Sequence, residues 1–142
     1  MIDITCIKRI IPHRPPVLAV DWVSEVEPGR FLVAHREITD DCPIGKLLES
    51  WAQAAVLLAR WENPNPDVRT GHVELLSGIR KVDVLGSVHP GDVVEHRVEL
   101  VRAIDDAAVF TGTSQVDGRP VLRIGSLTVA HRPVRVLQEE GT

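Results

Sequence analysis

Residues 47–59 read LLESWAQAAVLLA, and only Glu49, Ser50 and Gln53 in this stretch are polar. A helix that is apolar on nearly every face is a buried helix. The stretch therefore predicts a helix at the centre of the protein. A carboxylate in such a helix is unfavourable unless it is hydrogen-bonded, paired or kept for chemistry. Glu49 is therefore the first candidate functional residue.

The segments on either side set the bounds of this helix. Residues 40–43 (DDCP) place acidic side chains and a proline where a helix begins. Residues 63–66 (NPNP) end it and begin a loop. We expect the helix to span about residues 43–61.

The rest of the chain carries strand signals. Valine-rich residues 17–26 and 30–37 flank a Pro28-Gly29 turn, which predicts a hairpin before the helix. Gly78 predicts a bulge in the strand that contains it, and Asp117-Gly118 predicts a hairpin turn. The strands expected after the helix are residues 72–84, 93–101, 107–116 and 120–130.

The element order is a hairpin, one long helix and an antiparallel meander. Each sheet must bury one face, and the central helix is the only predicted segment long and apolar enough to cover it. This order predicts an α+β hotdog fold, in which a curved antiparallel sheet wraps around one long helix. Residues 1–142 are expected to form a single domain, with an N-terminal segment 1–16 and a polar, flexible tail about 134–142. Exposed sheet edges favour a dimer.

Composition excludes several classes of function. The net charge of −4 and the pI near 5.8 argue against nucleic-acid binding. The longest apolar run, residues 54–59, is too short to span a membrane, and the N-terminus lacks a signal-peptide pattern. We therefore expect a cytoplasmic protein without membrane contact. Cys6 and Cys42 give neither a disulfide framework nor metal-ligand spacing, and no cofactor or metal is predicted.

Three segments resemble the 3-hydroxyacyl-ACP dehydratases (FabZ and FabA type) of the hotdog superfamily. Residues 11–21 (IPHRPPVLAVD) resemble the family's "PHR-x-P-x-L-x-V-D" opening, and residues 48–55 (LESWAQAA) resemble its helix motif "L-E-A-x-A-Q-A". Residues 77–82 and 88–94 are similar to "G-I-x-x-V" and "V-x-P-G-D-x-L". The three segments occur in the family's order, and the resemblance spans roughly residues 10–130.

The resemblance implies a dimer with active sites at the subunit interface. A histidine of one subunit removes the α-proton of a 3-hydroxyacyl thioester, and an acidic residue on the other subunit's helix protonates the departing hydroxyl. By matching position, Glu49 is the acid, and an apolar pocket would favour its protonated form. Gly45 at the helix start and Gln53 are assigned to substrate binding, with the Gly45 N–H as an oxyanion donor. The non-catalytic alternative is a buried Glu49 hydrogen-bonded to Gln53.

The chain departs from the family in the loop before the helix. The family's histidine lies in a "G-H-F-P-G-x-P" loop. In this chain the corresponding segment, residues 39–49, is shorter and contains no histidine. No other histidine has a sequence context that marks a general base, and a structural role is expected for each: His13, His35, His72, His89, His96 and His131. Cys42, near the helix start where a thiol pKa is lowered, is a faint nucleophile candidate and more simply an inert small residue.

Three functions remain open from the sequence, and catalytic activity of the isolated chain is left undecided. The first is a dehydratase-family (hydro-lyase) subunit of fatty-acid or polyketide biosynthesis, acting on an acyl carrier protein or CoA thioester. It would contribute the acidic half of a shared site to a homodimer, or to a heterodimer with a histidine-bearing hotdog paralogue. The second is an acyl-CoA or acyl-ACP thioesterase that uses Glu49. The third is a non-catalytic acyl-binding or scaffold subunit. Acyl chain, carrier and pathway are not specified.

Overall fold

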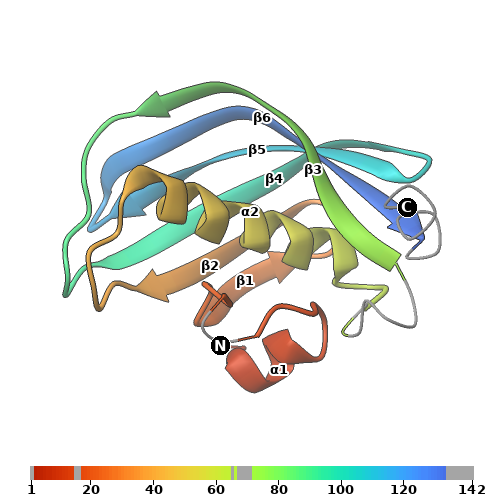
Figure 1. Ribbon diagram of the computed structural model, residues 1–142, viewed down its shortest axis with the longest axis horizontal. Helices are drawn as coiled ribbons and strands as arrows, with labels where there is room; N and C mark the ends of the chain where they lie inside the picture. The colour runs from red at the N-terminus through yellow and green to blue at the C-terminus, as the bar shows by residue number, and fades with distance from the viewer. Residues whose placement is uncertain (1, 15–16, 65, 67–71, 134–142) are drawn as a thin grey trace, which may run out of the picture.

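A curved sheet of six antiparallel strands wraps around one long helix in the computed structural model (Figure 1). The structure describes residues 2–14, 17–64, 66 and 72–133. The strand order is β1-β2-β4-β5-β6-β3, so β1 and β3 form the two edges. The elements are α1 (Ile4–Lys8), β1 (Trp22–Glu27), β2 (Phe31–Glu37), α2 (Ile44–Arg60), β3 (His72–Val84), β4 (Val93–Ile104), β5 (Ala107–Val116) and β6 (Arg119–Pro133).

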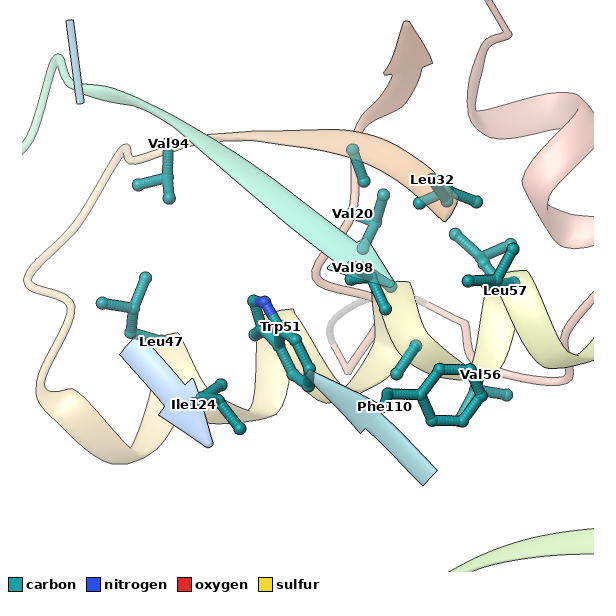
Figure 2. Close-up of a cluster of buried hydrophobic side chains, with 14 of the residues drawn as sticks. Val20, Leu32, Leu47, Trp51, Val56, Leu57, Val94, Val98, Phe110 and Ile124 are labelled. Carbon is teal, nitrogen blue, oxygen red and sulfur yellow. The ribbon is translucent and has the colours of Figure 1, made fainter. Parts of the chain in front are cut away.

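The helix α2 lies across the concave face of the sheet, as the apolar stretch predicted. Pro43 is its N-cap residue and Trp61 its C-cap residue, which confirms the expected bounds of 43–61. In Figure 2, Trp51 extends from α2 among apolar side chains of the sheet. Trp51 is fully buried, and its Nε1 donates to the carbonyl of Arg97 at 3.3 Å. This contact joins the middle of the helix to β4.

The close approach of the helix to the sheet requires a glycine at position 112. A Cβ added there would collide with the backbone oxygen of Arg97 and would lie 2.9 Å from Cζ2 of Trp51. Gly112 therefore leaves the space that the indole ring occupies on β5.

Most strand predictions are confirmed. β3 and β5 have the predicted bounds, while β4 and β6 extend further. The register of β3 against β6 shifts between Leu76 and Gly78, where the bulge was expected. Asp117 and Gly118 have φ angles of 49° and 78°. Positive values at both positions are typical of a type I′ hairpin turn.

The first strand is shorter than predicted, because β1 begins at Trp22 and not at Val17. The Val17 carbonyl and the Ala19 N–H bond to a helix side chain and not to the backbone of a neighbouring strand. The Ala19 N–H donates to Gln53 Oε1 at 2.7 Å, and Gln53 Nε2 donates to the Val17 carbonyl at 2.8 Å. The valine-rich composition indicated a strand, but this long-range contact determines the local conformation.

The short helix α1 was not predicted. Asp3 caps it, since its carboxylate accepts from the N–H groups of Thr5 and Cys6. Asp followed by a short mixed segment is a weak but readable N-cap signal. The expected tail 134–142 lies outside the described residues. No helix in the described ranges is long and apolar enough to cross a membrane.

Candidate active site

Glu49 is exposed in this chain, contrary to the expectation of a helix buried on nearly every face. The buried side of α2, which includes Leu47, Trp51 and Leu57, faces the sheet, and Glu49 lies on another side of the helix. Within the described residues Glu49 makes no hydrogen bond or ion pair, so the bond to Gln53 that the non-catalytic alternative required is not formed. Its carboxylate is therefore available to a ligand.

Glu49 lines an apolar groove of about 360 Å³ between α2 and the sheet. The groove is open beside the edge strand β3, where the side chains of Leu76 and Ile79 are 58% and 37% exposed. A second protein chain or an acyl group could cover this apolar surface. The groove residues are His13, Gly45, Leu48, Glu49, Ala52, Gln53, Val56, Leu76, Ile79, Leu127 and Val129.

A second hollow, the polar pocket, lies where the shortened loop passes the first turns of α2. Its volume is about 370 Å³, and Glu49 is the residue that its lining shares with the apolar groove. Glu49 thus borders both hollows. The polar-pocket residues are Val17, Ala19, Arg36, Ile38, Thr39, Asp40, Asp41, Cys42, Lys46, Leu47, Glu49 and Ser50.

Gly45 lies in the first turn of α2 and lines the apolar groove. Pro43, the N-cap residue, makes no side-chain hydrogen bond to the helix start. The first N–H groups of a helix have no acceptor within the helix, and they lie at the positive end of its dipole. Gly45 is exposed, and a Cβ added to it would meet nothing within 4 Å. Its role in substrate binding stays a prediction.

Gln53 is buried and holds the segment that precedes β1. Its amide bonds to Ala19 N–H and to the Val17 carbonyl, although its side chain also borders the apolar groove. The visible role of Gln53 is therefore to fix one wall of the site. Direct contact with a substrate stays a prediction.

A buried polar cluster lies directly behind Glu49. Ser50 Oγ lies 2.8 Å from His96 Nε2, and His96 Nδ1 lies 2.7 Å from Ser114 Oγ. Burial lowers the pKa of His96 to about 3, and the positive charges of His35 and Arg36 act in the same direction. His96 is consequently neutral at physiological pH. His96 alternates with Val94 and Val98 along β4, and all three are buried. No local pattern in the sequence identifies the partners of His96.

The sequence gives no reason to place His13 near Glu49. In the structure, both residues border the apolar groove. Other described histidines lie elsewhere. His35 Nε2 is 2.8 Å from Ser24 Oγ, with its ring stacked on Trp22 at 4.9 Å between centroids. His89 Nε2 is 3.2 Å from Ser87 Oγ. The structure thus offers one histidine, His13, on the Glu49 side of the helix among those whose side chains are described.

Cys42 does not have the lowered thiol pKa that a helix start would give. Burial raises its pKa, and the nearby Arg36 and Lys46 oppose this effect only in part. The thiol is therefore a weak nucleophile, consistent with an inert residue. In the described part of the chain, no group of three His, Cys, Asp or Glu side chains is arranged to hold a metal ion.

Comparison with known proteins connects this geometry to a family. The chain is 38% identical over 135 residues to the 3-hydroxyacyl-[acyl-carrier-protein] dehydratase FabZ of Anaeromyxobacter sp. (strain Fw109-5), with 85% of each chain covered. It is 31% identical over 134 residues to FabZ of Campylobacter curvus (strain 525.92), with 83% of this chain and 90% of the relative covered. No protein-family model matches the chain.

Solved structures confirm the fold. The dehydratase heterocomplex ApeI:P from Xenorhabdus doucetiae contains a chain that superposes with a TM-score of 0.79 at 17% identity, covering 96% of this chain and 97% of that one. The fluoroacetyl-CoA thioesterase FlK superposes with a TM-score of 0.66 at 12% identity, covering 82% of this chain and 96% of that one. These likenesses confirm the predicted hotdog architecture. The sequence identity to FabZ proteins shows that this chain belongs to the 3-hydroxyacyl-[acyl-carrier-protein] dehydratase family.

Proposed function

We propose that the chain acts in the dehydration of 3-hydroxyacyl thioesters carried by acyl carrier protein, in fatty-acid or polyketide assembly, with Glu49 as the acid. One observation carries this proposal. Glu49 occupies the acid position of the family's helix motif and is exposed where the apolar groove meets the polar pocket. The relatives that cover most of the chain are named for this reaction.

The site's geometry fits the chemistry. A base removes the proton from Cα, the electron pair forms the Cα–Cβ double bond, and the β-hydroxyl leaves as water with a proton from Glu49. The apolar groove would hold the acyl chain. The N–H groups at the start of α2, including that of Gly45, would stabilise the charge that develops on the thioester oxygen.

We infer that the base comes from a second, histidine-bearing hotdog subunit. Residues 39–49 contain no histidine, so a second copy of this chain would not supply the family's base from its own loop. The open side of the groove at β3 leaves space for a partner subunit. A dehydratase heterocomplex is among the solved structures with the same fold. These observations favour a shared site to which this chain contributes the acid.

The test is to measure conversion of 3-hydroxyacyl-ACP to enoyl-ACP by mass, for the chain alone and with a histidine-bearing hotdog paralogue. We expect no turnover by the chain alone and turnover by the complex. Glu49→Gln should lower kcat of the complex by about 100-fold or more, since an acid–base group typically contributes that much. Glu25→Gln on β1, which is exposed and lines neither hollow, is the matched control.

Other results would assign another function. Turnover by the chain alone that His13→Asn abolishes would contradict the partner's role and identify His13 as the base. Release of free thiol that depends on Glu49 would indicate a thioesterase. A stable complex whose turnover is unaffected by Glu49→Gln would indicate a scaffold subunit.

A further inference from the structure

A chain of buried hydrogen bonds runs from the sheet to the wall of the polar pocket. It joins Ser114 on β5, His96 on β4 and Ser50 on α2, and it ends at the carbonyl of Ala19. Ser114 and His96 are 0% exposed and Ser50 is 2% exposed. We call Ser50, His96 and Ser114 the relay.

The direction of the hydrogen bonds follows from the last one. Ser50 Oγ donates its hydrogen to the Ala19 carbonyl at 2.5 Å, so it must accept from His96 Nε2–H. Nδ1 of the neutral ring then accepts from the hydroxyl of Ser114. Each group donates toward Ala19, and hydrogen bonds aligned in this way strengthen one another.

The end of the relay belongs to the site. Ser50 follows Glu49 in the chain, and Ser50, Glu49 and Ala19 all line the polar pocket. One turn later, Gln53 holds Ala19 N–H and the Val17 carbonyl. The turn of α2 that carries Glu49 is therefore tied to the sheet behind it through His96, and to the pocket wall beside it through Ser50 and Gln53.

We propose that the relay positions Glu49 and the adjoining pocket wall for the reaction, with His96 and Ser50 as positioning residues that do not touch the substrate. A purely stabilising role explains the relay less well, because an apolar side chain of similar volume would avoid the burial of three polar groups. A satisfied buried network, in contrast, selects one arrangement of the helix turn. The kinetic test of this proposal rests on the proposed function, because it requires dehydratase turnover.

The kinetic test uses the complex with its partner subunit and the variants His96→Leu, His96→Gln and Ser50→Ala. Misplacing a catalytic group by about 1 Å costs on the order of 100-fold in rate. We therefore expect kcat to fall about 10- to 100-fold in His96→Leu and Ser50→Ala, with KM changed less than about twofold. His96→Gln, whose amide can both donate and accept, should keep most of the activity. Ser87→Ala is the matched control, since Ser87 pairs with His89 on an exposed turn.

A second measurement does not depend on turnover. In the full-length chain, ¹⁵N NMR should show His96 as the Nε2–H tautomer. The ¹³C carboxyl resonance of Glu49 should be single and unchanged in His96→Gln, but shifted or broadened in His96→Leu and Ser50→Ala. A Glu49 resonance that is unchanged in both of these variants would overturn the proposal. So would equal kcat values across the series.

The two readouts separate the two proposals. Absence of turnover by the wild-type complex would refute the proposed function, while the Glu49 resonance would still decide whether the relay positions this turn. If His96→Leu does not fold, Ser50→Ala, which removes one hydroxyl group, decides the question.

Discussion

At the scale of single residues, His96 links folding stability to pH. Its pKa in the folded chain is about 3, against an ordinary value of 6.5. Between these values the unfolded chain binds the proton and the folded chain does not. The contribution of His96 therefore becomes less favourable to folding as pH falls below 6.5, by up to about 1.4 kcal/mol for each pH unit.

This loss of stability at low pH can be tested by urea unfolding of wild type and His96→Leu at pH 7 and pH 4.5. Wild type should lose more free energy of unfolding on acidification than the variant, by about 2 kcal/mol, because the variant has no imidazole to protonate. Carboxylates contribute equally to both proteins and cancel in the comparison. Parallel losses would show that His96 takes up its proton at the same pH in the folded and the unfolded chain.

The sequence singled out some residues that line the two hollows and gave no local signal for others. The helix motif predicts Glu49 as the acid of a dehydratase, and this role stays a prediction. The motif did not reveal that Glu49 is exposed, because the apolar run indicated burial on nearly every face. Ser50 and His96 are separated by 46 residues, and no local pattern reports a contact at that distance.

At the scale of elements, the close packing of α2 against the sheet depends on Gly112. Gly112→Ala should lower the free energy of unfolding by about 2 kcal/mol or more, because the new methyl group meets the Arg97 backbone and the Trp51 ring. Gly45→Ala is the control. Its added Cβ meets nothing within 4 Å, and alanine favours a helix over glycine by about 1 kcal/mol. Urea unfolding should show opposite signs for the two variants, and equal effects would contradict this packing account.

The apolar groove along α2 gives a second prediction at this scale. Ala52 borders the groove three residues after Glu49, so Ala52→Leu should fill space beside the acid. In the active complex, kcat/KM for long 3-hydroxyacyl chains should fall about tenfold relative to short ones, an effect of the size expected in an apolar pocket. Ala59→Leu, which lies outside the groove, is the control. An unchanged chain-length profile would place the acyl chain elsewhere.

The observed bounds of the strands show which structural features local sequence signals are enough to predict. The bulge at Gly78 and the turn at Asp117-Gly118 were read correctly, since both depend on backbone preferences of the residues themselves. Residues 17–21 were misread as strand. Gln53 and Ser50 from a distant helix hold the backbone of Val17 and Ala19.

At the scale of the whole molecule, the edge strand β3 forms the proposed interface with a partner subunit. Leu76 on this strand is 58% exposed and borders the apolar groove. Leu76→Lys should shift native mass from a dimer or heterodimer toward the monomer, because a charge would be placed in the proposed interface. Val101→Lys on β4 is a matched control, since Val101 is 56% exposed and lies outside the groove. Loss of association in both variants would argue against a β3 interface.

The sequence by itself determined the hotdog fold, the bounds of the central helix and the family, because periodicity, turn residues and short motifs are local properties of the chain. The tertiary structure decided the rest of the site. It set the exposure of Glu49, the two hollows that meet there, His13 beside the groove and the buried relay behind it. These features depend on which face of α2 meets the sheet and on contacts between distant strands, and packing of the whole chain fixes both.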